Sequence, residues 1–263
     1  MKAPSNKTTK GFPVRPARGF SLIETVIAIG VVAVLLSGFL IVFAPAAKGI
    51  KESINSKAAA RLVNTLEQEL VSLRGNDQST EFSTGFDKAF EYIKGSIGTA
   101  TNPADPDNAL LVYKYRASLS TNRIGDGTPE PIGSIDNLIP GEDFVVRNMM
   151  RRKGDAEFVN DIPAIEGPVY VVKCTQLVLN ADGELVIGDP GQIFNTDDPL
   201  TTPDDESTVE AMTSDEYNRA VIAFVADFYA LPSRGTAFFD SQFGTLFPNL
   251  SRPAFSRNLA VRR

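Results

Sequence analysis

The sequence predicts an α+β protein, in which a long N-terminal helix packs by its second half on a mainly antiparallel β-sheet head. Three observations predict this fold class. A run of 23 residues without a charge extends from Thr25 to Ala47. An amphipathic segment follows it directly, and short strand-like runs separated by turn-rich stretches make up most of the remaining chain. This order of elements indicates one membrane-anchored head rather than several domains.

The uncharged run is long enough to cross a membrane. As a helix with a rise of 1.5 Å per residue it would be about 34 Å long, against a hydrocarbon core of about 30 Å. Glu24 stands directly before this run. Because a carboxylate inside a membrane is costly, Glu24 either lies among lipid head groups or has a cationic partner.

The segment Gly19-Phe20-Ser21-Leu22-Ile23-Glu24, between a basic leader and an apolar helix, resembles the processing signal of type IV pilins and pseudopilins. The resemblance extends to about Arg74. It implies that a prepilin peptidase cuts after Gly19 and methylates the new N-terminus, which gives N-methylphenylalanine at Phe20. It also implies that Glu24 is the acidic residue used in assembly. A free α-amino group with a pKa of about 7.7–8 would be cationic, so it could pair with Glu24 of a neighbouring subunit.

Charge is distributed unevenly along the chain. The formal net charge is −6, but residues 1–19 hold five basic residues and no acid, which leaves −11 for the rest. Basic residues before a membrane span favour a cytoplasmic N-terminus and an exported remainder. We therefore expect a single-pass protein of the bacterial inner membrane, with a transmembrane segment at about 22–47, whose head lies outside and later joins a filament in the periplasm or at the cell surface.

Histidine is absent, and Cys174 is the only cysteine. The usual general base, the usual zinc ligand and every Ser-His or Cys-His nucleophile system are therefore missing, which argues against an enzyme. No disulfide can form within the chain. Because many type IV pilins close a C-terminal loop with a disulfide, the resemblance points to a minor pilin or a pseudopilin.

The second half of the predicted helix is amphipathic. Apolar residues recur every three or four positions and form one stripe, and Gly75-Asn76 supplies a stop signal. The stripe consists of Ile50, Ile54, Ala58, Leu62, Leu66, Leu70 and Leu73. The predicted organisation is therefore a leader at 1–19, a long helix at 20–74 and a head at 75–263, which is the pilin-like lollipop.

The head is predicted to contain a short helix around Phe86–Ile97, capped by Thr84, and several strands. Residues 122–140 are turn-rich, and 180–183 (Asn-Ala-Asp-Gly) form a hairpin signal. Residues 220–231 are assigned to a strand, with a helix as the alternative. Strands are predicted at 109–120, 169–179, 184–187, 220–231 and 254–261, the last as a closing edge strand.

An acidic loop is the candidate cation site. Eleven carboxylates and no Lys or Arg lie between Cys174 and Asn218. Oxygen ligands of this kind suit Ca²⁺, although their spacing matches no defined motif and a solvated loop is the alternative. The candidate calcium ligands are Asp197, Asp198, Asp204 and Asp205.

The C-terminal tail is basic and aromatic. After Asp240 it contains four arginines, at 252, 257, 262 and 263, three phenylalanines, at 243, 247 and 255, and no acid. Such a composition can bind single-stranded nucleic acid. The arginines are sparse and the rest of the head is acidic, so nucleic acid is an unfavoured partner and the phenylalanines are assigned to the core.

These observations favour a structural subunit of a type IV pilus-like (fimbrial) or type II secretion-like filament. Its implied partners are the prepilin peptidase, other subunits in a homo- or hetero-filament, the inner membrane and the assembly platform. The principal alternative is a membrane-anchored extracytoplasmic domain that binds calcium or DNA and does not polymerise. A plain signal anchor, a secretory signal cleaved near Ala44-Pro45-Ala46 and a secreted enzyme are weaker alternatives.

Overall fold

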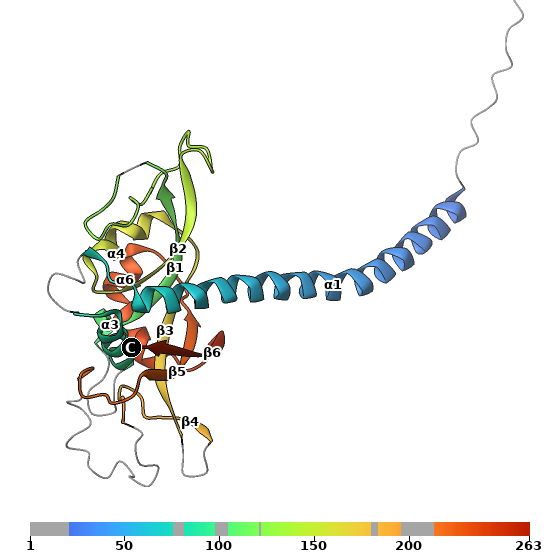
Figure 1. Ribbon diagram of the computed structural model, residues 1–263. Helices are drawn as coiled ribbons and strands as arrows, with labels where there is room; N and C mark the ends of the chain where they lie inside the picture. The colour runs from blue at the N-terminus through green and yellow to red at the C-terminus, as the bar shows by residue number, and fades with distance from the viewer. Residues whose placement is uncertain (1–20, 76–81, 98–104, 121, 180–183, 196–212) are drawn as a thin grey trace, which may run out of the picture. The chain divides into compact units, whose positions relative to one another are not determined.

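The computed structural model describes residues 21–75, 82–97, 105–120, 122–179, 184–195 and 213–263. For residues 40 and 42–56 it describes the helical backbone alone. The chain divides into two compact units, Met1–Asn55 and Ser56–Arg263. Figure 1 shows the labelled elements of both units.

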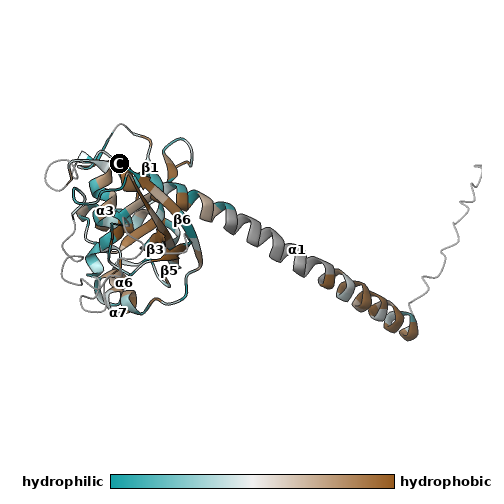
Figure 2. Ribbon diagram, turned by 60° about the horizontal axis from the view of Figure 1, so that its bottom comes forward, coloured by the Kyte–Doolittle hydropathy of each residue, from teal (hydrophilic) through white to brown (hydrophobic). Residues whose placement is uncertain are grey.

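The longest element is α1, a helix of 50 residues from Leu22 to Val71. Its N-terminal part, Leu22–Phe39, is the one described helix that is long and apolar enough to cross a membrane, and none of it is buried. Figure 2 shows the hydrophobic residues at this end of the helix. The predicted membrane-length helix is therefore confirmed in its described part.

The second unit is built on an antiparallel sheet with the strand order β2-β1-β3-β5-β6, and β4 pairs with β3 beside this path. The strands are β1 (Leu110–Ser118), β2 (Phe144–Arg152), β3 (Ile165–Leu179), β4 (Leu185–Ile187), β5 (Val221–Ala230) and β6 (Phe255–Arg262). β2 and β6 form the two edges of the main path. The predicted α+β class is confirmed.

Apolar clusters lie on both faces of the sheet. On one face, Leu62, Leu66 and Leu70 of α1 pack with α3 (Gly85–Gly95) against β1, β3 and β5. The other face is covered by helical segments, with Phe158, Phe239 and the fully buried Phe243 among their core residues. These segments are α4 (Ala156–Asp161), η2 (Ile162–Ala164), α6 (Thr236–Ser241), α7 (Phe243–Leu246) and η3 (Phe247–Asn249).

The predicted stripe on the helix is confirmed where its side chains are described. Leu66 and Leu70 are fully buried, whereas the side chains of Ile50 and Ile54 lie outside the described set. The helix ends at Val71, three residues before the predicted limit at Arg74. The shorter end has a physical reason, because the Ser72 carbonyl accepts a hydrogen bond from Lys88 Nζ at 2.8 Å.

The short predicted helix is α3, and Thr84 caps it as predicted. The Thr84 hydroxyl accepts the Asp87 N–H at 3.1 Å, and the Asp87 carboxylate accepts the Thr84 N–H at 2.8 Å. The strand, rather than helix, assignment for 220–231 is confirmed by β5, and the closing edge strand is β6. The hairpin strands at 169–179 and 184–187 correspond to β3 and β4, which are paired.

Candidate assembly site

The first turn of α1 holds Glu24 through a reciprocal capping box. Ser21 Oγ accepts the Glu24 N–H at 3.2 Å, and the Ser21 N–H donates to Glu24 Oε2 at 2.9 Å. A Ser-x-x-Glu sequence at a helix start satisfies two backbone donors in this way. The carboxylate of Glu24 is consequently directed toward the N-terminal end of the helix, where the helix dipole also favours a negative charge.

The segment behind Glu24 exposes its whole apolar surface. Leu35 and Ile41 are 67% and 74% exposed, and Leu22, two residues before Glu24, is 83% exposed. Its hydroxyl groups are satisfied inside the helix, since Ser37 Oγ donates to the Ala33 carbonyl at 2.8 Å and Thr25 Oγ1 donates to the Leu22 carbonyl at 3.0 Å. A helix that satisfies its own polar groups and exposes aliphatic side chains is suited to lipid or to other apolar helices.

Several predicted site residues lie outside the described residues. These are Gly19 and Phe20 of the processing signal, and the calcium candidates Asp197, Asp198, Asp204 and Asp205. Within the described ranges, no group of three or more His, Cys, Asp or Glu residues is arranged to hold a metal ion. Glu24 is therefore the predicted site residue whose local geometry is available.

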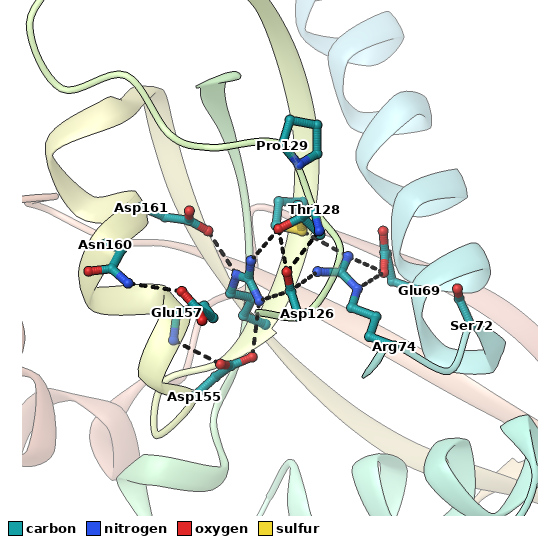
Figure 3. Close-up of polar contacts among 12 residues, drawn as sticks. Glu69, Ser72, Arg74, Asp126, Thr128, Pro129, Asp155, Glu157, Asn160 and Asp161 are labelled. Carbon is teal, nitrogen blue, oxygen red and sulfur yellow. Dashed lines mark hydrogen bonds and ion pairs between the residues drawn. The ribbon is translucent and has the colours of Figure 1, made fainter. Parts of the chain in front are cut away.

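A second concentration of charge lies inside the head, and sequence reasoning missed it. We call it the ion cluster, and Figure 3 shows most of its contacts. Its centre is Arg151 on β2, which donates from Nη1 to Asp126 Oδ2 at 2.6 Å and from Nε to Asp161 Oδ2 at 2.8 Å. The full set is Glu69, Arg74, Asp126, Arg151, Asp155 and Asp161.

Arg74 connects the end of α1 to the same cluster. Its Nη1 donates to Asp126 Oδ2 at 3.0 Å, and its Nε donates to Glu69 Oε2 at 3.1 Å. Two arginines therefore share the Asp126 carboxylate, and one of them follows the long helix directly. Arg74 is not part of the predicted apolar stripe, but its side chain is only 12% exposed.

Burial and charge shift the pKa values of the cluster in different directions. Burial alone would raise the pKa of Asp126, but hydrogen bonds from Thr128 and the nearby guanidinium of Arg151 lower it to about 2. Burial raises the pKa of Asp161 against the opposing charge of Arg151. The Tyr113 hydroxyl also donates to Asp161, and burial raises the pKa of this tyrosine well above its usual value.

The ion cluster is buried and links several elements of the head, which indicates a structural role. The side chains of Arg151 and Asp161 are 1% and 0% exposed, so a substrate would have no access to them. The cluster joins the end of α1, the segment between β1 and β2, strand β2 and helix α4. Breaking such a buried set is costly because it leaves charges without compensation. It therefore fixes these elements together rather than supplying chemistry.

The aromatic part of the C-terminal tail belongs to the core, as predicted. Phe243 and Phe247 are fully buried, with ring centroids 5.6 Å apart in a stacked arrangement. Phe255 stacks on Phe228 at 4.4 Å. None of these three rings is therefore arranged as an exposed stacking platform for nucleic-acid bases.

Residues 14–40 match the family described as the prokaryotic N-terminal methylation motif, which is the signal of type IV pilins and pseudopilins. The match includes Gly19, Phe20 and Glu24 and most of the exposed apolar segment. The chain thus combines this signal with an apolar N-terminal helix and an α+β head, which supports a type IV pilin-like or pseudopilin protein. No curated protein and no solved structure matches the chain.

Proposed function

We propose that the chain is a structural subunit of a type IV pilus-like or type II secretion-like filament, in the role of a minor pilin or a pseudopilin. The observation that carries this proposal is the exposed apolar helix Leu22–Phe39, which begins within the methylation motif. In the proposal, a prepilin peptidase cuts after Gly19 while the helix lies in the inner membrane. The subunit then leaves the membrane when neighbouring apolar helices replace the lipid around its own.

The proposed role of Glu24 is to pair with the new amine of Phe20 on a neighbouring subunit. The capping box supports this role because it directs the carboxylate toward the N-terminal end of the helix. Among residues 22–41, Glu24 is the one charged side chain. In a bundle of apolar helices, a buried carboxylate or amine is costly unless it is paired with an opposite charge. Each subunit therefore has one position along its neighbour's helix at which the Glu24 carboxylate and the amine are paired.

The first test is the mature N-terminus, which mass spectrometry can identify. We expect it to be a methylated Phe20, and we expect Gly19→Leu to leave the leader attached. A mature chain that begins at Ala47 would instead support an ordinary secretory signal. An uncut chain would support the membrane-anchored binding domain.

The second test separates assembly from insertion. Glu24→Ala should leave insertion and cleavage intact, and insertion should become easier because no carboxylate is desolvated. Incorporation into a fibre should fail, since an unpaired buried amine costs about 3–5 kcal/mol. Glu24→Gln should give an intermediate result, and Thr25→Ala is the matched control in the same turn. Fibre co-purification or crosslinking measures incorporation, and equal incorporation of Glu24→Ala would exclude this assembly role.

A further inference from the structure

Strand β6 is an edge of the sheet, and its outer side carries backbone groups that the described part of the chain does not use. All eight of its residues pair with β5. Directly after the strand, the Arg263 N–H donates to the Ala220 carbonyl at 2.8 Å, so the odd-numbered residues bond to β5. The even-numbered residues therefore direct their N–H and C=O groups outward. Those of Asn258, Ala260 and Arg262 have no hydrogen-bond partner among the described residues.

The backbone of β6 has none of the features that usually prevent an edge strand from pairing with another chain. Natural proteins shorten such a strand, interrupt it with proline or a bulge, or cover it. β6 is eight residues long, contains no proline and keeps a continuous register with β5. A regular edge strand of this length is a template for the addition of another extended segment.

The charges along this edge are all of one sign. Arg252, Arg257, Arg262 and Arg263 are exposed, and no acidic residue follows Asp240. Within the described ranges, the first three of these arginines form no ion pair with a carboxylate. Two copies of the same basic edge would repel each other, whereas an acidic segment would be attracted. The charge of the edge therefore selects an acidic partner and disfavours a second β6.

The side chains of β6 define the sequence pattern of such a partner. Val261 is buried in the cluster beneath α1 and α3, Leu259 packs against the same cluster, and Arg257 alternates onto the same face. Arg262 lies on the opposite face. A segment added antiparallel, with its first residue opposite Arg262 and its sixth opposite Arg257, would therefore match best as acidic, apolar, any residue, apolar, polar, acidic.

We propose that β6 is the docking site for an extended acidic segment of a partner protein, which adds to the sheet as a further antiparallel strand. The phosphates of a nucleic acid would match the arginines but not the alternating N–H and C=O groups on the outer side of the strand. A polypeptide with the stated pattern matches both. The proposal does not rest on the filament role, since it needs only the head and its edge strand.

A synthetic peptide tests the backbone part of the proposal. The fluorescent probe Ser-Glu-Val-Thr-Val-Thr-Glu-Ser carries the pattern, and fluorescence anisotropy measures its binding to the full chain in detergent micelles. Its first Thr lies opposite Ala260, where its N–H would donate to β6. N-methylation of this Thr should weaken binding about fivefold, because one hydrogen bond is lost. N-methylation of the next Val is the matched control, since that N–H points away from β6, and it should leave the affinity unchanged.

Charge exchange tests the side chains. Arg257→Glu combined with Arg262→Glu should weaken binding of the probe about tenfold, and a probe with Lys in place of both Glu residues should bind this variant as the original binds the wild type. Arg147→Glu, on the other edge strand β2, is the matched control and should bind the original probe normally. Protection of the buried Cys174 thiol from a thiol reagent verifies that each variant is folded.

Three results would overturn the proposal. The first is the absence of saturable binding by the original probe. The second is an equal effect of the two N-methylations, because the contact would then not be a strand pairing. The third is a failure of the lysine probe to bind the folded double variant. If the second result occurs and an oligothymidylate of equal charge displaces the probe, β6 is a surface for polyanions rather than for an extended protein segment.

Discussion

Replacing Arg151 by alanine should destabilise the head more than any other single charge removal on β2. Its guanidinium contacts Asp126, Asp155 and Asp161, and its side chain is 1% exposed. Arg151→Ala leaves buried carboxylates without compensation, and breaking a buried ionic set in this way costs about 3–5 kcal/mol. For a unit of this size each kcal/mol lowers the melting temperature by about 2–4 °C. We therefore expect a fall of about 10 °C.

Cys174 provides an assay that follows the head alone in the full chain. It is the only thiol, it is 1% exposed, and burial raises its pKa to about 12, so the folded head should not react with a thiol reagent at neutral pH. The temperature at which labelling begins therefore reports unfolding of the head. The matched control is Arg147→Ala, an exposed arginine on the same strand.

If Arg151→Ala and Arg147→Ala begin to label within about 1 °C of each other, the ion cluster does not stabilise the head. A double-mutant cycle with Asp126→Ala extends the test. Because the two side chains are in contact, the cost of the double variant should be smaller than the sum of the single costs.

Two further predictions concern acid and packing. The pKa of Asp126 falls from an ordinary 3.8 to about 2, so its contribution of about 2 kcal/mol is complete above pH 3.8 and disappears as the pH falls toward 2. Near-UV circular dichroism should show this acid loss in the wild type and a flatter profile in Asp126→Asn, and identical profiles would contradict it. Gly85→Ala should cost about 3 kcal/mol or more, because the new Cβ would lie 2.1 Å from the Val71 carbonyl oxygen. Gly244→Ala is its control, since the nearest atom there is 3.7 Å away, and equal thiol-labelling temperatures for the two variants would argue against the clash.

Local patterns were sufficient for much of the fold. The uncharged run, the Thr84 cap and the apolar segment at 220–231 each carry their signal within a short stretch of sequence, and the structure confirms all three elements. The motif at Gly19–Glu24 is equally local. Its geometry before Ser21 stays a prediction, because residues 1–20 lie outside the described ranges.

The missed elements depend on contacts between distant residues. β2 forms an edge of the sheet, but its sequence lacks the apolar pattern that predicts a strand. It contains the polar residues Arg147, Asn148, Arg151 and Arg152. α4 is a helix of six residues that packs Phe158 into the core, and α6 and α7 have six and four residues. Elements of this length are specified by their packing rather than by their periodicity.

The ion cluster illustrates the same difficulty for sites. Arg74 and Asp126 are 52 positions apart, and Asp126 lies 25 positions before Arg151. Each residue alone resembles an ordinary surface charge. Only the antiparallel pairing of β1 with β2, together with the end of α1, brings them together. The sequence around Asp126 carries one local signal, which is that of a turn. The Asp126 side chain accepts the Thr128 N–H, two residues on, as aspartates in structured turns commonly do.

The way the C-terminal end of α1 is held has a mechanical consequence. Leu66 and Leu70 are buried in the core, Lys88 Nζ holds the Ser72 carbonyl, and Arg74 is bonded to Asp126. A pull along the helix axis would load these attachments together, in shear, rather than opening them one after another. Force applied to this end of the helix would therefore reach the core of the head through several attachments at once, and no single contact would carry the whole load.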